Sequence, residues 1–82
     1  MPHRPLCDIA REIQKDWSKD GTKPIYFGAV PYLQAMRTMS HVAENYGADE
    51  GRSIVIYFLA NANTWKGETA RRIKKELKEM VK

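Results

Sequence analysis

The apolar residues of the chain recur at spacings of three and four positions, which predicts helices. In the first predicted helix, residues 5–17, these spacings align one apolar stripe made of Leu6, Ile9, Ala10, Ile13 and Trp17. Pro5 suits the first turn of a helix, and Gly21 supplies a turn after it that tolerates a positive φ. The segment therefore carries both the stripe and the end signals of an amphipathic helix.

A second helix is predicted over residues 30–46, where a broad apolar face extends from Tyr32 to Tyr46. Pro31 lies in its first turn, and Gly47 is the expected C-terminal stop. The preceding residues are too aromatic for a plain solvent loop. We expect a short extended segment at 24–28 that lies across the helices.

The third predicted helix covers residues 50–62, with Asp49 as its N-cap. Its centre, residues 54–60, is apolar on every side, and such a run suits a buried strand or a buried helix. The β-branched residues in the run favour a strand. We favour a helix, because Ala60 and Ala62 continue the pattern without a turn signal.

The fourth predicted helix begins after a cap at Asn63 or Thr64 and ends at about residue 81. Its apolar stripe consists of Ala70, Ile73, Leu77, Met80 and Val81. Together the segments predict an all-α fold, a compact bundle of about four helices in a single domain, residues 1–82.

The length and the single cysteine bear on the oligomeric state and the cellular compartment of this protein. A chain of 82 residues buries only about 60–65% of its unfolded surface, so its core is thin and we expect a homo-oligomer. Cys7 alone forms no internal disulfide, and no stretch approaches the roughly 18–20 apolar residues of a membrane span. These features favour a cytoplasmic location and no membrane partner.

The net charge of +4 comes from the end of the chain. Residues 1–63 contain seven Lys/Arg and seven Asp/Glu, whereas residues 64–82 contain seven Lys/Arg and three Glu. Spacings of four residues predict that two pairs, Arg72–Glu76 and Lys75–Glu79, neutralise part of the excess. A basic patch attracts phosphates, acidic partners or anionic lipid, and the alternative is a solvated helix face that complements the helix dipole.

The turn before the fourth helix has backbone groups suited to an anion. A helix that begins near Thr64 or Trp65 leaves the N–H groups of Lys66, Gly67 and Glu68 without acceptors in the helix. These groups point outward at the positive end of the helix dipole, and Gly67 allows a ligand to come close to the backbone. The segment therefore predicts a phosphate or nucleotide site.

The side chains of the same turn complete this prediction. Trp65 offers a flat face on which a base can stack, and Lys66 adds a positive charge. Asn61 and Asn63 both donate and accept hydrogen bonds. The alternative is an ordinary helix cap in which Trp65 belongs to the core.

Two further segments are candidates for binding. The aromatic stretch from Tyr26 to Tyr32 can line a pocket or a partner surface, and the alternative is a loop anchored to the core. Cations of the fourth helix can follow a nucleic-acid backbone: Arg71, Arg72, Lys74, Lys75 and Lys78.

Catalytic and metal-binding patterns are missing from the sequence. His3 and His41 are far apart and accompany one cysteine, so no metal-ligand spacing exists. Ser40 and His41 are adjacent on a predicted helix and do not face each other. No Gly-Lys-Ser/Thr phosphate-binding loop occurs. We therefore expect no cofactor and no enzymatic activity.

Two blocks of the chain, Tyr26–Met36 and Ile54–Lys78, resemble segments of small accessory proteins encoded by tailed phages and prophages. The resemblance covers most of the chain but brings no assigned activity, so no residue roles follow from it. It implies a phage accessory protein in the cytoplasm of a bacterial host cell. By analogy, such proteins inhibit a host protein, sequester a host signalling nucleotide or bind DNA.

The leading hypothesis is a counter-defence protein that sequesters an anionic, nucleotide-type immune signal of the host. In this hypothesis Trp65 stacks on the base, and the remaining site residues are Lys66, Gly67, Asn61, Asn63, Arg71, Arg72, Tyr26 and Tyr32. One alternative is a protein–protein inhibitor of a host defence complex that uses residues 26–32. The other is a small basic protein that binds nucleic acid through the fourth helix.

Overall fold

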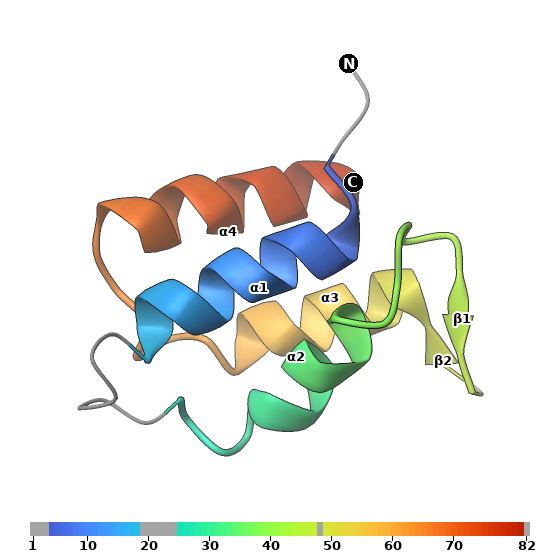
Figure 1. Cartoon of the computed structure of the whole chain (residues 1–82), viewed down its shortest axis with the longest axis horizontal. Coiled ribbons are helices and arrows are strands. Elements are labelled where there is room, and N and C mark those ends of the chain that lie inside the picture. The colour runs from blue at the N-terminus through green and yellow to red at the C-terminus, as the bar shows by residue number, and fades with distance from the viewer. Residues whose placement is uncertain (1–3, 19–24, 48, 82) are drawn as a thin grey trace.

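The computed structural model describes residues 4–18, 25–47 and 49–81. Over these residues it contains four helices: α1 (Leu6–Trp17), α2 (Val30–Met36), α3 (Gly51–Ala60) and α4 (Glu68–Met80). Two short antiparallel strands, β1 (Asn45–Tyr46) and β2 (Asp49–Glu50), lie between α2 and α3 (Figure 1). The predicted all-α bundle is confirmed.

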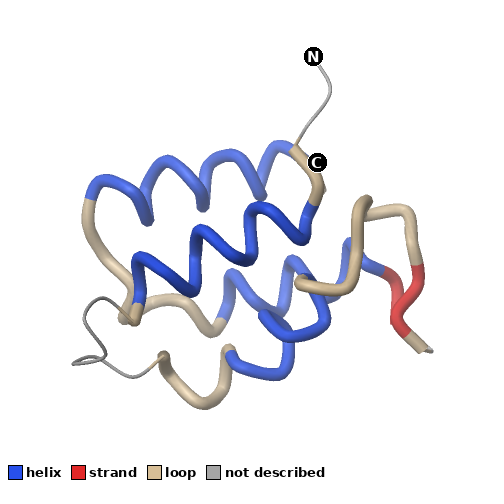
Figure 2. The backbone as a smooth tube through the Cα atoms, in the orientation of Figure 1, coloured by secondary structure: helices blue, strands red, loops and turns tan. Residues whose placement is uncertain are grey.

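The helices form a closed ring of contacts around one core. α1 packs against α2 and α4, and α3 packs against the same two helices. The two-stranded hairpin projects at the end of the bundle where α3 begins (Figure 2). Buried side chains from all four helices form one cluster, with Phe58 of α3 among its largest fully buried members.

Helix α1 agrees with its predicted stripe, because its five predicted stripe residues are all buried. The first N–H groups of a helix have no acceptor within it, and here the main chain of a distant segment supplies two. The N–H of Leu6 donates to the carbonyl oxygen of Ser40 at 3.2 Å, and the N–H of Cys7 donates to that of Met39 at 2.8 Å. Residues 39–40 are thus fixed against the start of α1.

This contact explains why α2 is shorter than predicted. The helix ends at Met36 and not at residue 46. The Thr38 hydroxyl donates to the Ala35 carbonyl oxygen at 2.8 Å, and the Met39 N–H donates to the Met36 carbonyl oxygen at 3.1 Å. These bonds tighten the chain into a turn, and residues 39–40 then reach α1.

The residues after this turn form the hairpin. Asn45 pairs with Glu50 and Tyr46 pairs with Asp49. Gly47 has a φ of +63°, so it provides the turn of the hairpin and is not the stop of a helix. The predicted Asp49 cap is also wrong, because Asp49 belongs to β2 and Glu50 is the N-cap of α3.

The ambiguous apolar run is a helix, as we favoured. Within α3, Ile54, Val55 and Phe58 are buried. The helix begins at Gly51, whose N–H donates to the Glu44 carbonyl oxygen at 2.7 Å. A Cβ atom at this glycine would lie 2.5 Å from Met39 Cε and 2.8 Å from the Val42 carbonyl oxygen, so the close approach requires glycine.

Helix α4 ends near its predicted limit and buries Ala70, Ile73 and Leu77 of its predicted stripe. The extended segment at 24–28 is not observed where the structure describes it. The N–H of Ala29 donates to the Tyr26 carbonyl oxygen at 2.9 Å, which makes a turn that leads into α2. Pro24 and the predicted turn at Gly21 lie outside the described residues.

Candidate functional site

Trp65 belongs to the core and cannot stack on a ligand, so this prediction is wrong. Its side chain is 2% exposed, and its ring stacks on Trp17 with 5.6 Å between centroids and 11° between planes. Phe58 contacts it edge-on at 6.5 Å, and the indole N–H donates to Asp16 Oδ2 at 2.9 Å. Both the ring face and the polar edge are therefore used within the protein.

The start of α4, where we predicted an anion site, also differs from the prediction. The helix begins at Glu68, with Gly67 as its N-cap at a φ of +116°. The N–H groups of Lys66 and Gly67 therefore precede the helix, and Glu68 places a carboxylate in the first turn. Neither Asn63 nor Thr64 caps α4.

The two asparagines cap the other end of the connection. The Asn61 side-chain amide donates to the Tyr57 carbonyl oxygen at 2.9 Å, and that of Asn63 donates to the Ala60 carbonyl oxygen at 3.4 Å. These carbonyl groups lie in the last turn of α3, where main-chain donors run out, and the Tyr57 carbonyl oxygen also accepts the Asn61 N–H at 3.2 Å. The amides thus terminate α3.

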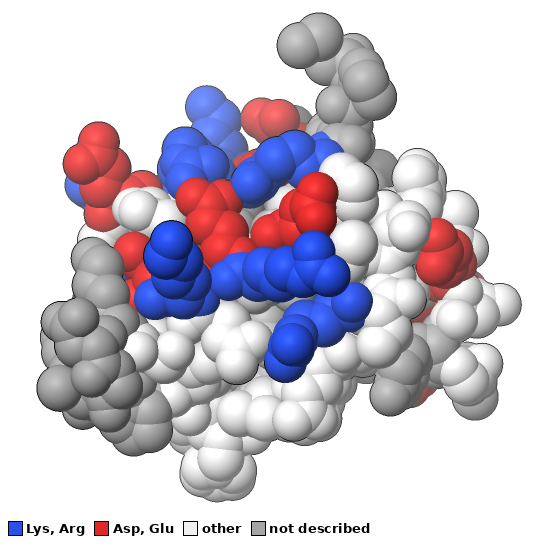
Figure 3. Space-filling model, in the orientation of Figure 1, with Lys and Arg blue, Asp and Glu red and all other residues white. Residues whose placement is uncertain are grey.

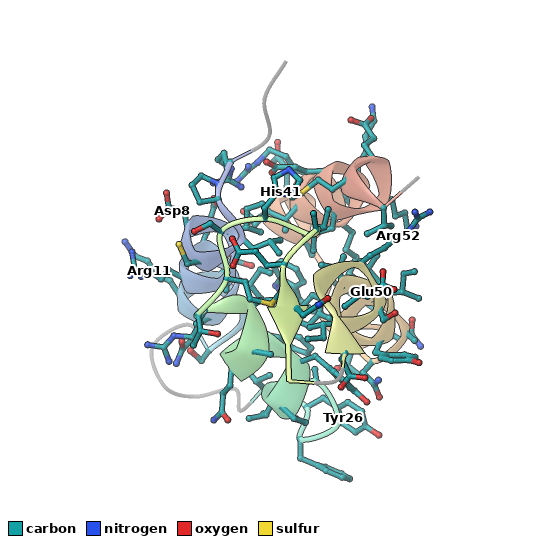
Figure 4. The ribbon with its side chains drawn as sticks, turned by 90° about the vertical axis from the view of Figure 1, so that its right-hand side faces the viewer. Asp8, Arg11, Tyr26, His41, Glu50 and Arg52 are labelled. Carbon is teal, nitrogen blue, oxygen red and sulfur yellow. The ribbon has the colours of Figure 1, made fainter. Side chains whose placement is uncertain are left out.

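Three predicted site residues nevertheless meet. Tyr26, Asn61 and Asn63 line an open pocket of about 340 Å³, together with Ala60 and Thr64. Figure 4 shows Tyr26 at the lower edge of the molecule, below α2 and α3. Among the described residues, no charged side chain lines this pocket. It therefore suits an uncharged group better than a phosphate, and Tyr32 lies elsewhere, with its ring 5.5 Å from that of Tyr57.

The charged residues of α4 fall into two groups, and the first faces α1. Arg72 forms an ion pair with Glu12 of α1. Arg4 bonds Glu12 at 2.7 Å and bonds both carboxylate oxygens of Glu76, at 2.8 and 3.1 Å. The predicted pair of Arg72 with Glu76 is therefore wrong, because both residues have partners outside α4.

This network shifts the ionisation of its members. The hydrogen bond from Arg4, followed by that from Arg72, lowers the pKa of Glu12. The hydrogen bond to Glu76 is the largest cause of a raised pKa at Arg4. Arg72 is thus held by α1, and its predicted contact with a phosphate has no support in this arrangement.

The second group of charges faces away from α1. Arg71, Lys74, Lys75 and Lys78 follow one another at spacings of three and four, so they lie on one side of α4, and we call them the basic stripe. Among the described residues none of the four forms an ion pair, which also excludes the predicted Lys75–Glu79 pair. Figure 3 shows Lys and Arg gathered over α1 and α4, while the surface below, over α2, is mostly uncharged.

Lys74 anchors the stripe to the core. Its Nζ donates to the Trp65 carbonyl oxygen at 2.7 Å and lies 5.8 Å from the centre of the Trp65 ring. Burial lowers the pKa of Lys74, and the positive charges of Lys78 and Lys66 lower it further. Lys66, which the sequence assigned to a nucleotide site, therefore contributes to the same positive region.

Sequence reasoning missed the exposed residues of α3. Ile56 is 45% and Tyr57 is 47% exposed, although the run 54–60 is apolar on every side. No signal within the run distinguishes its outer face from its inner face. The short length of α2, which leaves part of α3 uncovered, was equally invisible.

The described residues contain no group of three or more His, Cys, Asp or Glu side chains placed to hold a metal ion. No described helix has the length and apolar character needed to cross a bilayer.

The fold and surface define a class: a small all-α protein in which ion pairs join α1 to α4, while exposed rings lie on α3 and on the segment before α2. Comparison with known proteins found no family model, no curated protein and no solved structure that matches the chain.

Proposed function

We propose that the protein binds nucleic acid through the basic stripe on α4, by contacts with the phosphate backbone and without sequence specificity. The observation that carries this proposal is a row of cations without an ion pair among the described residues, of which Arg71, Lys75 and Lys78 are exposed and Lys74 is held on the Trp65 carbonyl oxygen. Like charges at spacings of three and four destabilise a helix. An anionic partner would remove that repulsion and release counterions from the nucleic acid.

The length of the stripe favours a polymer over a single nucleotide. From Arg71 to Lys78 the helix rises by about 10 Å. That distance corresponds to about three successive phosphates on one strand of a duplex, at about 3.4 Å each along the axis. The pocket beside Tyr26 has no cation in its described lining, so it adds nothing to the recognition of a free nucleotide phosphate.

Base-specific recognition has no comparable support. The residues that precede the basic stripe are Gly67, Glu68, Thr69 and buried Ala70, of which only Glu68 and Thr69 offer polar side chains to base edges. The cations of the stripe are long side chains that suit phosphate contacts. We therefore propose contacts with the phosphate backbone and not with base edges.

Two adjacent arginines provide a matched test. Arg71→Gln removes a cation of the basic stripe, whereas Arg72→Gln removes a cation of the same helix that is paired with Glu12. Binding to a labelled 20-base-pair DNA duplex would be measured by fluorescence anisotropy at several salt concentrations. Wild type should show an affinity that falls log-linearly with salt, with a slope of about −3 for the three exposed cations.

We expect Arg71→Gln to weaken binding and to reduce that slope by about 1, whereas Arg72→Gln leaves the slope unchanged. Equal effects of the two variants would contradict the assignment to this face of α4. Free mononucleotides and cyclic dinucleotides serve as competitors. If one of them displaces the duplex at concentrations near its own Kd, the ligand is a small nucleotide and the proposal of a backbone-binding protein is wrong.

A further inference from the structure

A second open pocket lies between α1 and the end of α2. Its volume is about 260 Å³, and it is lined by four exposed side chains: Arg11, Gln34, Arg37 and Thr38. Arg11 belongs to α1, and the other three belong to the last turn of α2 and the two residues that follow it. In the described part of the chain no carboxylate lines this pocket, which we call the arginine pocket.

The geometry of α2 explains why these side chains meet. Residues three and four positions apart lie on one side of a helix, so Gln34 is aligned with Arg37 and Thr38. Arg37 keeps a helical conformation, with a φ of −65° and a ψ of −18°. α1 packs against α2, and Arg11 extends outward from α1 on the side of the molecule opposite Arg52 (Figure 4). Two guanidinium groups from separate elements therefore line one depression.

The main chain fixes the two arginines relative to each other. The residues directly after Thr38 are bonded to the start of α1 through the N–H groups of Leu6 and Cys7. Arg37 is itself held in the turn, because its N–H donates to the Leu33 carbonyl oxygen at 3.1 Å. The frame of the pocket is thus set before any ligand arrives, which reduces the entropy lost on binding.

Neither guanidinium group has a strong partner within the protein. None of the ion pairs among the described residues includes Arg37. Its side chain is also not needed to cap α2, since the Ala35 carbonyl oxygen accepts the Thr38 N–H at 3.1 Å and the Thr38 hydroxyl at 2.8 Å. Arg11 pairs with Asp8 at 3.4 Å, and both side chains are more than half exposed. Such a pair contributes little, so two like charges lie together with little compensation.

We propose that the arginine pocket binds the phosphate group of a small phosphate monoester. Charge selects this ligand, because a monoester carries about −1.5 to −2 at pH 7, which matches two guanidinium groups. A carboxylate or the phosphodiester of a nucleic acid carries a single negative charge. The N–H groups of an arginine bond two oxygens of a phosphate at once, and the Gln34 amide adds a further donor.

The size and chemistry of the pocket favour a small molecule over a phosphorylated protein. Pockets for drug-sized ligands measure roughly 300–1,000 Å³, so about 260 Å³ holds a phosphate group with little of the molecule attached to it. All four lining side chains are polar, whereas the centre of a protein–protein interface is apolar.

The arginine pocket lies on α1 and α2, and the basic stripe lies on α4, so this site does not depend on the proposed binding of nucleic acid. Arg37→Gln should leave the salt dependence of duplex binding unchanged. Failure of the stripe would appear as weak duplex binding by wild type, and failure of the pocket would appear only with the probes below.

The test compares methyl phosphate, a monoester, with dimethyl phosphate, a diester, in titrations followed by two-dimensional amide NMR. The amide signals of residues 34–38 should shift with methyl phosphate, and dimethyl phosphate should bind at least about threefold more weakly. Arg37→Gln should weaken the binding of methyl phosphate at least about threefold. Arg52→Gln, which removes the same charge from an exposed position on the opposite side of the molecule, is the control.

A second pair of variants acts in the opposite direction. Asp8→Asn removes the carboxylate that competes for Arg11, so it should strengthen the binding of methyl phosphate. Asp49→Asn makes the same substitution at an exposed position of β2 and should leave the affinity unchanged. The amide spectrum of each variant also reports whether it is folded.

The proposal is overturned if methyl phosphate shifts none of these amide signals or if dimethyl phosphate binds as tightly. It is also overturned if Arg52→Gln weakens binding as much as Arg37→Gln, or if Asp49→Asn strengthens it as much as Asp8→Asn. A phosphoserine peptide that binds more than about tenfold more tightly than methyl phosphate would overturn the choice of a small molecule.

Discussion

The α1–α4 side and the α2–α3 side cover one core in different ways. Across α1 and α4, charged side chains bridge the helices, with Arg4 and Arg72 on Glu12 and Arg4 on Glu76. Across α2 and α3 the covering groups are rings, and Tyr32 lies against Tyr57. The first side leaves a row of cations exposed, and the second leaves apolar rings exposed, so the two sides suit partners of opposite chemistry.

Trp65 is the residue where the two sides meet. Its ring contacts Trp17 of α1 and Phe58 of α3, and its carbonyl oxygen accepts a hydrogen bond from Lys74 of α4. We expect Trp65→Ala to have the largest effect, a loss of about 3–5 kcal/mol in the free energy of unfolding, because it leaves a cavity in the shared core. Urea unfolding followed by circular dichroism would measure the loss.

Tyr57→Ala is the control for this prediction, because Tyr57 is 47% exposed. This variant also removes an aromatic ring, but from the exposed side of α3, where no cavity opens. A urea midpoint for Trp65→Ala that equals that of Tyr57→Ala would mean that Trp65 does not hold the two sides together.

A smaller effect is expected where the connection from α2 meets α3. Gly51→Ala adds a methyl group 2.8 Å from the Val42 carbonyl oxygen, a backbone atom that moves only with its segment. We expect a loss of about 1–3 kcal/mol by overpacking, although alanine favours a helix more than glycine does. Gly47→Ala is the comparison, since it meets no atom within 4 Å and strains only a φ of +63°.

Gly47→Ala should cost about 1 kcal/mol for its left-handed conformation. Thermal denaturation of both variants would rank them. If Gly51→Ala is as stable as wild type, residues 39–44 do not approach α3 as closely as described.

The smallest effect concerns the charged side alone. Arg4 and Arg72 lower the pKa of Glu12 in the folded protein. The ionised carboxylate therefore stabilises the fold fully at a pH above its pKa in the unfolded chain, which is about 4.3. This contribution disappears as the pH falls through the lower pKa of the folded protein. Because the Glu12 side chain is 33% exposed, Glu12→Gln should cost no more than about 1 kcal/mol at pH 7.

The difference between Glu12→Gln and wild type should shrink below about pH 4 and in high salt. Urea unfolding at pH 7 and at lower pH would measure both dependences. Glu79→Gln, at an exposed position of α4 outside the network, is the matched control. A difference between Glu12→Gln and wild type that stays constant with pH would contradict an ionised Glu12 in the network.

The spacing of apolar residues was sufficient to predict the amphipathic helices. Both α1 and α4 were found from their stripes, because packing uses the face that the spacing defines. The end of α2 could not be predicted, because it depends on hydrogen bonds between residues 39–40 and the start of α1. Apolar spacing continued past Met36, and tertiary contact overrode it.

The candidate site was predictable only in part, for a similar reason. The cluster of Tyr26, Asn61 and Asn63 was named from residue types, and the structure brings these residues into one pocket. In the sequence, Trp65 fits a ligand site and a core equally well. Its place in the core follows from the stacking of its ring on Trp17, which the sequence does not show. Arg71 and Arg72 have the same charge, and their different surroundings follow from the angle at which α4 packs on α1.

The main-chain bonds from Leu6 and Cys7 to residues 39–40 have a consequence for how this protein can change over generations. Carbonyl oxygens are common to every amino acid, so replacement of Ser40 leaves the acceptor in place. Proline at position 6 or 7 would remove one of the two donors, so neither position accepts it without loss of a bond. The path of the backbone therefore limits drift here: the exposed side chain of Ser40 is free to vary, whereas Met39 is also held by its burial in the core.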